Sequence, residues 1–191
     1  MSGEYYKTKE SVDEYIRLCE EYNGAQLIEK LKGFLPLNSN LLEIGSGPGT
    51  DWKMLSTYFD VTGSDNSTEF LNRLINKNPD SEFLELDAIT LDTNKKFNGI
   101  YSNKVLHHLT DEEIEASIKR QYEILSPEGI ICHSFWKGEG SEIYNGLYVN
   151  YHSDLSIRSL FTDHFEILLI ESYGEFEKGD SLLVIGKIKQ A

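Results

Sequence analysis

The 191-residue sequence has little cysteine, no long hydrophobic run and no cluster of metal-binding side chains. Its two cysteines, Cys19 and Cys132, lie far apart in apolar patterns, which predicts buried free thiols. Neither these cysteines nor the five histidines have the spacing of metal ligands, so we expect no metal site. No apolar run is long enough to cross a bilayer, and the polar N-terminus lacks the hydrophobic segment of a signal peptide. We therefore expect a cytoplasmic protein without a membrane role.

Basic residues are also few. The chain has 18 Lys and Arg against 32 Asp and Glu, which gives a formal net charge of −14. Such a surface repels a polyanion such as tRNA or DNA, so a small or cationic substrate is favoured over a nucleic acid. The length and the apolar content of 39% fit a single globular domain with a sizeable core. Nothing in the sequence indicates an oligomeric state.

Hydrophobic patterns along the chain alternate between the periods of helices and strands. Helical spacing covers residues 10–34, with a break near Asn23 and Gly24. Thr110 and Glu113 have the spacing of a capping box and mark the start of a later helix. Strands are expected at residues 41–44, 60–65, 82–87, 97–103, 130–135, 165–173 and 182–188, with a short helix at 153–161 and a long loop at 136–151. This order predicts an α/β fold with a doubly wound, mostly parallel seven-stranded sheet and an antiparallel C-terminal hairpin.

The first expected strand leads directly into a glycine-rich turn, Gly45-Ser46-Gly47-Pro48-Gly49. Glycine at alternate positions lets the backbone approach a ligand without an intervening Cβ atom, and the amides of the turn and of the next helix face that ligand. A dinucleotide-binding fingerprint would place its third glycine or alanine at Thr50, one residue later. Glu43 precedes the first glycine by two residues, where a carboxylate would repel phosphate but suits a ligand with an amine.

The glycine turn, the acidic residues that follow it and the reversed final strand resemble a small class I S-adenosylmethionine (SAM)-dependent methyltransferase, of the type called methyltransferase domain 11 or 12. The resemblance covers nearly the whole chain and implies a Rossmann-like fold. It implies one domain, residues 1–191, in which residues 1–36 form an N-terminal helical lid and residues 37–191 form the core. The implied activity is transfer of a methyl group from SAM to a small-molecule acceptor by in-line displacement.

The resemblance assigns SAM binding to residues at the ends of four successive strands. The implied cofactor residues are Glu43, Gly45, Ser46, Gly47 and Gly49 at the glycine turn, Asp65 and Asn66 after the second strand, Asp87 and Ala88 after the third, and Asn103 and Lys104 after the fourth. Asp65 would accept hydrogen bonds from the ribose hydroxyls, Asp87 would read the adenine amine and Glu43 would contact the methionine amine. The alternatives are a turn cap at Asp65, a solvated acid at Asp87 and a structural brace at Glu43.

His107 and His108 follow the fourth strand, near the expected point of methyl transfer, and are the candidate catalytic residues. The pKa of an imidazole suits it to accept a proton from a nucleophile. The alternative is that one ring packs against the sheet while the other contacts the backbone. Because methyl transfer is a direct displacement, alignment of the reactants supplies much of the acceleration, and a base matters mainly for an alcohol or an ammonium acceptor.

Aromatic side chains gather in two further segments. The implied lid has three tyrosines, Tyr5, Tyr6 and Tyr15. They would stack on adenine or contact the sulfonium, unless the N-terminal helix simply packs on the sheet. The expected long loop carries Trp136, Tyr144, Tyr148 and Tyr151. These rings favour either an apolar or planar acceptor or a small core within the loop itself.

Two other functions fit part of the pattern. A non-catalytic SAM-binding domain would share most of the same residues. An NAD(P)-dependent oxidoreductase would need the dinucleotide spacing that Thr50 breaks, and a Tyr-x-x-x-Lys pair, for which Tyr101 and Lys104 lie one residue too close. The chain also lacks the Asn-Pro-Pro-Tyr-type segment that amino-methylating nucleic-acid enzymes carry after the fourth strand, which again favours a small-molecule acceptor.

Overall fold

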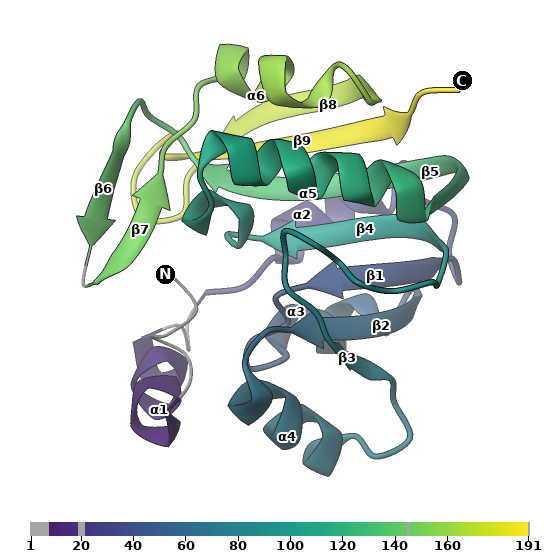
Figure 1. Cartoon of the computed structure of the whole chain (residues 1–191), viewed down its shortest axis with the longest axis vertical. Coiled ribbons are helices and arrows are strands. Elements are labelled where there is room, and N and C mark those ends of the chain that lie inside the picture. The colour runs from purple at the N-terminus through teal and green to yellow at the C-terminus, as the bar shows by residue number, and fades with distance from the viewer. Residues whose placement is uncertain (1–7, 19–21, 145, 191) are drawn as a thin grey trace.

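The computed structural model describes residues 8–18, 22–144 and 146–190. Over these residues the chain forms a seven-stranded sheet in the order β3-β2-β1-β4-β5-β9-β8, flanked by helices (Figure 1). The strands of this sheet are β1 Asn40–Ile44, β2 Asp60–Asp65, β3 Phe83–Glu85, β4 Phe97–Asn103, β5 Leu125–Trp136, β8 Phe165–Tyr173 and β9 Ser181–Ile188. Neighbours from β3 to β5 are parallel, whereas β9 runs antiparallel to both β5 and β8. The predicted doubly wound α/β fold with an antiparallel C-terminal hairpin is confirmed.

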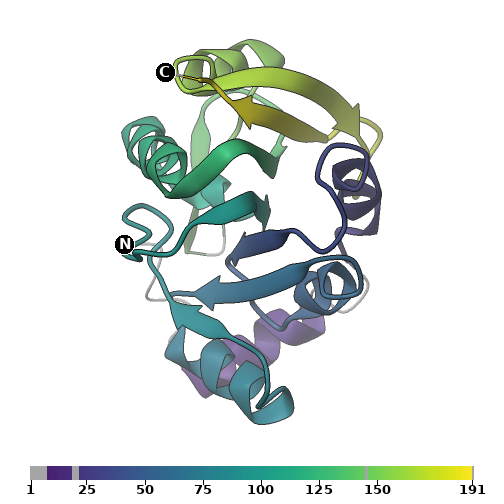
Figure 2. The same cartoon turned by 90° about the vertical axis from the view of Figure 1, so that its right-hand side faces the viewer.

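The sheet has a hydrophobic core on each face, and Figure 2 shows the helix layers edge-on. The helices are α1 Lys9–Leu18, α2 Ala25–Leu31, α3 Thr50–Leu55, α4 Thr68–Lys77, α5 Asp111–Ile124 and α6 Asp154–Phe161, with a 3-10 turn, η2, at Leu106–His108. α5 and α6 cover one face, and α2 and α3 cover the other. Leu42 packs in the first core and its neighbour Leu41 in the second, because successive residues of a strand point to opposite faces. A strand covered on both faces needs apolar residues at nearly every position.

The helix boundaries follow the local signals in the sequence. α5 begins at the predicted capping box, where Thr110 Oγ1 accepts from the Glu113 amide at 3.3 Å and the Glu113 side chain accepts from the Thr110 amide at 2.9 Å. The helical stretch expected at 10–34 is divided into α1 and α2 near the predicted break, with Gly24 as the N-cap of α2. Cys132 is a buried free thiol, whereas Cys19, Tyr5 and Tyr6 lie outside the described residues. No helix within the described ranges is long and apolar enough to cross a membrane.

The segment 136–151 is not the long loop that the sequence predicted. It contains an antiparallel hairpin of β6 Ser141–Tyr144 and β7 Leu147–Asn150, and Gly146 in its turn has a φ of 80° that favours glycine. The prediction was wrong because β6 is only four residues long and exposed throughout, so no buried alternation marks it in the sequence. The hairpin lies on the same side as α1, the side toward which the carboxyl ends of β1, β2 and β4 point (Figure 1).

Gly24 joins the N-terminal segment to the rest of the fold at a position with no room for a side chain. A Cβ atom there would overlap the hydroxyl of Tyr101 and the carboxylate of Asp51. Both groups are held by a hydrogen bond to each other at 2.7 Å, so neither can move aside cheaply. We therefore expect Gly24→Ala to lower the free energy of unfolding by about 2–3 kcal/mol, the typical cost of overpacking, as measured by urea denaturation. The matched variant Gly33→Ala, whose Cβ would meet the Lys30 carbonyl oxygen at 3.2 Å, should cost clearly less. An equal cost for the two variants would contradict this account.

Candidate functional site

The carboxyl ends of β1, β2 and β4 and the segment after β3 surround an open cavity of about 740 Å³, part of which is solvent-exposed. Seven of the predicted cofactor residues line it: Gly45, Gly47, Asp65, Asn66, Ala88, Asn103 and Lys104. His108 and Tyr15 line it as well. Apolar residues that the sequence did not single out complete the wall: Ile44, Phe70, Leu86, Val105 and Leu109. Parallel strands end at one edge of the sheet, which is why residues so far apart in the chain meet here.

The three glycines of the turn all have positive φ but serve different purposes. Gly45 has a φ of 71°, and a Cβ there would lie 2.5 Å from the side chain of Val105. Gly49 has a φ of 84°, and a Cβ there would overlap Leu74. Gly47 has a φ of 48°, and the nearest atom to its Cβ would be 4.0 Å away, on a ring that lines the cavity. Packing thus requires the outer two glycines, whereas at Gly47 an added side chain would enter the cavity.

The Asp65 carboxylate fixes this turn. Its Oδ2 atom accepts a hydrogen bond from the Gly47 amide at 2.9 Å, and its Oδ1 atom accepts one from the Ser67 amide at 2.9 Å. Burial raises the pKa of Asp65, while the amides of Ser67 and Gly47 oppose that increase. Asp65 therefore acts as a turn cap, which was the alternative interpretation, and at the same time forms part of the cavity wall.

A second buried carboxylate, Asp51, was not predicted as a site residue. Its Oδ1 atom accepts from the Gly24 amide at 2.7 Å, and its Oδ2 atom accepts from the Tyr101 hydroxyl at 2.7 Å and from Asn103 Nδ2 at 3.0 Å. Asp51 belongs to the first turn of α3, directly after the glycine turn. The only signal for it in the sequence is this position, two residues after Gly49, where an acid also suits a helix N-terminus.

Not all of the predicted residues at the ends of β3 and β4 line the cavity. Asp87 is exposed and does not line it; its Oδ1 atom caps a turn by accepting from the Ile89 amide at 2.7 Å. Ala88, the next residue, does line the cavity. Asn103 is held on both sides of its amide, since it donates to Asp51 and accepts from Ser134 Oγ at 2.6 Å.

Lys104 contributes to the wall, but its ammonium group is bound on the side of β8 and β9. It forms an ion pair with Glu175 and donates to Ser181 Oγ at 2.8 Å. The same nitrogen lies 3.4 Å from the centroid of the Trp136 ring, a cation–π contact. Burial lowers the pKa of Lys104, and the Glu175 carboxylate opposes that decrease. The charge of Lys104 is therefore compensated within the protein.

The two candidate catalytic histidines have different surroundings. His108 lines the cavity, and its Nδ1 atom lies 2.8 Å from the carbonyl oxygen of Tyr148. Because a carbonyl only accepts, Nδ1 carries the hydrogen and the lone pair is on Nε2. His107 is buried, does not line the cavity and has an Nδ1 atom without a hydrogen-bond partner among the described residues. The two ring centroids lie 4.0 Å apart, and burial lowers the pKa of both imidazoles, which are therefore neutral near pH 7.

The described part of the chain has no group of three or more His, Cys, Asp or Glu residues arranged to hold a metal ion. Residues 41–129 match the model of a family described as methyltransferase domain. The chain is also 37% identical over 93 residues to an uncharacterised methyltransferase of Oceanobacillus iheyensis; this match covers 48% of the chain and 44% of that protein. The chain thus spans less than half the length of this curated relative in the match.

The fold is also similar to that of solved methyltransferases. The 1,6-didemethyltoxoflavin-N1-methyltransferase of Burkholderia thailandensis, bound to 1,6-didemethyltoxoflavin and S-adenosylhomocysteine (SAH), has a TM-score of 0.78 at 18% identity, with 93% of this chain and 83% of that chain covered. The N-methyltransferase NodS of Bradyrhizobium japonicum WM9, in complex with SAH, has a TM-score of 0.73 at 16% identity, with 95% and 98% covered. Residues 41–129 thus resemble a methyltransferase domain in sequence, and the whole chain resembles these methyltransferases in fold. At these identities the two structures establish its fold.

Glu43, two residues before the glycine turn, is a buried acid with one oxygen unsatisfied within the described ranges. Its side chain is only 2% exposed, and its Oε2 atom has no hydrogen-bond partner in the described residues. Burial raises the pKa of Glu43 to about 8, the charges of Asp51 and Asp65 add to the increase, and a hydrogen bond from Ser46 opposes it. Neither Glu43 nor Ser46 lines the cavity directly. The acid is therefore largely protonated at neutral pH, beside the glycine turn.

The raised pKa of Glu43 predicts how the free energy of unfolding depends on pH. Between pH 4.5 and 8 the folded protein keeps a proton on Glu43 that the unfolded chain has released, so its contribution to the free energy of unfolding falls as pH rises. The neutral isostere Glu43→Gln should therefore gain stability over the wild type from pH 5 to pH 9, on the order of a few kcal/mol. Urea denaturation at pH 5, 7 and 9 measures the difference. Glu115→Gln, an exposed acid on α5, is the control. A difference that does not change with pH would rule out the buried proton.

Proposed function

We propose that the protein is a SAM-dependent methyltransferase that transfers a methyl group to a small-molecule acceptor. The observation that carries the proposal is the glycine turn at the cavity. Its central residue, Gly47, would point a Cβ into the cavity toward the Tyr15 ring, and the turn is fixed by a carboxylate, Asp65, that also lines the cavity. A nucleoside with vicinal hydroxyls suits such a carboxylate, because each oxygen has a second lone pair to accept with.

The remaining wall fits the other parts of SAM. We assign the ribose hydroxyls to Asp65 and Asn66, the adenine to the segment at Ala88, and the methionine end to the region of Asn103. Glu43 lies outside the wall, two residues before the glycine turn. Glu43 supports this assignment, since it is a buried acid with an unpartnered oxygen and would gain from a nearby ammonium group. The two solved relatives described above were both determined with SAH, which supports the same ligand here.

SAM, when bound, supplies a methyl group on a positively charged sulfur, which an acceptor displaces in line. The protein's part is to orient the two reactants and to exclude water. We assign His108 the acceptance of a proton from the acceptor, because it lines the cavity and its hydrogen bond to Tyr148 leaves the lone pair on Nε2. His107 lies behind it and supports its ring. One of the solved relatives is bound to the heterocycle that it methylates, which supports a small-molecule acceptor.

We further propose that residues 1–36 act as a lid over a core formed by residues 37–191. Tyr15 of α1 lines the cavity, and its ring meets Phe70 of α4 edge-on, with the centroids 5.9 Å apart. An ion pair of 2.6 Å between Asp13 and Arg73 adds a second contact between the same two helices. These contacts hold the segment beside the cavity, where its rings would cover the cofactor.

Calorimetric titration with SAH, NAD and NADP in parallel tests the cofactor. We expect micromolar binding of SAH alone. Gly47→Ala should fold, with an unchanged circular dichroism spectrum, but should bind SAH at least about tenfold more weakly, because its methyl group would occupy the ligand's path. Binding of a nicotinamide cofactor, or of none of the three ligands, would overturn the proposed function. Normal SAH binding by folded Gly47→Ala would show that the turn does not approach the cofactor.

A thermodynamic cycle distinguishes the binding of the ribose by Asp65 from its support of the glycine turn. Asp65→Ala should weaken SAH binding by roughly 1.5–3 kcal/mol, about 10- to 150-fold, because charge-assisted hydrogen bonds to the ribose are lost. An SAH analogue that lacks both ribose hydroxyls should bind wild type and variant with nearly the same affinity. If the variant weakens both ligands equally, Asp65 acts only by bracing Gly47.

A further inference from the structure

The part of the cavity wall that follows β3 receives little support from the sheet. β3 pairs with β2 over only three residues, and the chain then runs through an irregular segment, residues 86–93, before β4. Leu86 and Ala88 of this segment line the cavity. The Leu86 amide still donates to the Asp65 carbonyl oxygen of β2 at 3.1 Å, but beyond it the backbone hydrogen bonds are local, such as that from the Leu91 amide to the Asp87 carbonyl oxygen at 2.9 Å. The sheet thus holds the start of the segment, and the contacts that hold residues 88–93 come from α5.

A buried series of hydrogen-bonded side chains leads from β4 through β5 and α5 to this segment. The Ser102 hydroxyl lies 2.7 Å from His133 Nδ1, and His133 Nε2 lies 2.8 Å from Gln121 Oε1. Gln121 Nε2 donates to Ser117 Oγ at 3.2 Å, and Ser117 Oγ donates to the Ala88 carbonyl oxygen at 2.6 Å. The four side chains are fully buried. Each side chain in this series has its hydrogen-bond partners, so the series is rigid.

The Ala88 carbonyl, at one end of this series, determines the direction of every hydrogen bond in it. The Ala88 carbonyl can only accept, so the hydroxyl hydrogen of Ser117 points to it and the Gln121 amide must donate to Ser117. Gln121 then presents its carbonyl oxygen to His133, which must carry its hydrogen on Nε2 and accept from Ser102 on Nδ1. Burial keeps His133 neutral by lowering its pKa to about 3. The series therefore ends in the Ser117 hydroxyl, a fixed donor to the Ala88 carbonyl oxygen.

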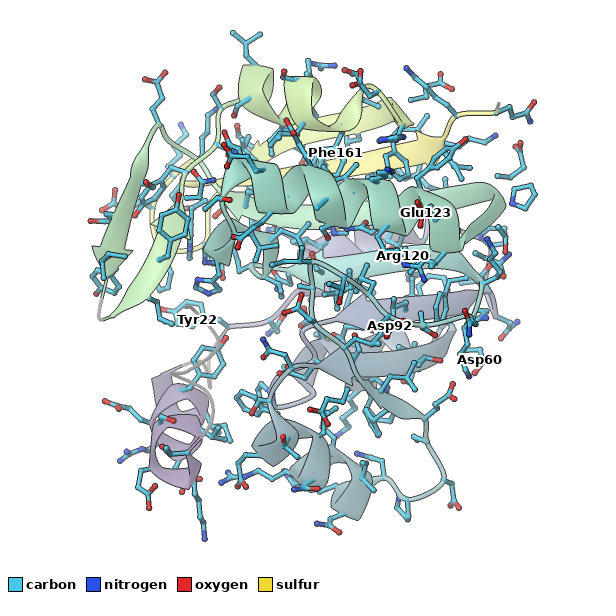
Figure 3. The ribbon with its side chains drawn as sticks, in the orientation of Figure 1. Tyr22, Asp60, Asp92, Arg120, Glu123 and Phe161 are labelled. Atoms are coloured by element: carbon cyan, nitrogen blue, oxygen red, sulfur yellow. The ribbon has the colours of Figure 1, made fainter. Side chains whose placement is uncertain are left out.

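Arg120, one helical turn from Ser117 on the same helix, holds the far end of the segment. Its Nε atom donates to the Leu91 carbonyl oxygen at 3.2 Å and its Nη2 atom to the Thr93 carbonyl oxygen at 2.6 Å. Its Nη1 atom pairs with Glu123 at 2.9 Å. Figure 3 shows Arg120 of α5 beside the segment that carries Asp92. α5 thus binds three carbonyl oxygens of residues 86–93.

We propose that α5 positions the purine subsite of the cofactor cavity, with Ser117 and Arg120 as positioning residues for the segment that reads the base. The inference rests on the proposed function, because the base is that of SAM. Ser117 holds the peptide of Ala88 in the wall, and Arg120 prevents the rest of the segment from moving away from the sheet. Neither residue touches the cavity, so both act through the backbone that they hold.

Arg120→Gln is the main test, because Arg120 is only half-buried and its loss leaves the core intact. Arg158→Gln, the same substitution on α6, is the matched control. Ser117→Ala is the second variant. The first measurement is hydrogen exchange of the amides of residues 86–93 in the ligand-free protein, which should become about tenfold faster in Arg120→Gln and unchanged in Arg158→Gln. This readout requires no ligand.

The second measurement compares the affinity for SAH with that for S-inosylhomocysteine, in which a carbonyl replaces the adenine amine. Arg120→Gln and Ser117→Ala should each weaken SAH binding about fivefold, roughly the effect of one hydrogen bond. They should weaken binding of the inosine analogue less, so that the ratio of the two affinities, which measures the discrimination between the ligands, becomes smaller. A merely structural role would weaken both ligands equally.

Each outcome has a defined meaning. Faster exchange together with narrowed discrimination supports the proposal. Unchanged exchange in both variants overturns the role of α5. Faster exchange with unchanged discrimination shows that the segment is held by α5 but does not read the base, which also overturns the proposal. If the wild type binds no SAH at all, the proposed function fails, and the exchange data then report on the support of the segment alone.

Discussion

The buried carboxylate of Asp51 is the interaction on which the geometry of the site depends. It accepts three hydrogen bonds from two parts of the chain: one from the backbone before α2 at Gly24, and two from the end of β4 at Tyr101 and Asn103. Asp51 itself lies in the first turn of α3, so the glycine turn is connected to both of them. A charge buried in this way is stable only while its partners remain, because each lost partner leaves part of it unsatisfied. The elements around the cavity are therefore held in a common frame by polar contacts as well as by packing.

Three carboxyl groups, Glu43, Asp51 and Asp65, surround a single glycine turn in a protein whose net charge is already strongly negative. Two of them are stabilised by backbone amides, and the third avoids repulsion by keeping its proton. Placing three acids so close together has an electrostatic cost, which adds to burial in raising the pKa of Glu43. It does create a favourable potential for a cationic ligand, which agrees with a donor that carries both a sulfonium and an ammonium group.

Local patterns predicted the strands of the seven-stranded sheet, the glycine turn and the capping box of α5, because each is decided by residues close in sequence. They missed the short, exposed hairpin of β6 and β7. The residues that end the parallel strands were predicted as a group for a similar reason, since topology brings those ends together. Asp51 could not be found in this way, because its partners lie 27 to 52 positions away. For Asp87 the position was predicted, but the contact of its side chain was not. Its place at the end of a strand was evident, but nothing local determined that its carboxylate would cap a turn instead of lining the cavity.

The reversal of β9 has a consequence for how this scaffold diversifies. β8 ends at Tyr173 and β9 begins at Ser181, so the connection between them lies beside the end of β4 and not at the opposite edge of the sheet. That connection carries Glu175, which pairs with Lys104, and Phe176, whose ring lies 5.4 Å from that of Trp136. Insertions or deletions in it leave the pairing of β8 with β9 intact, because surface connections change length more freely than the strands that they join. Evolution and protein engineers alike can therefore remodel this side of the site without rebuilding the sheet.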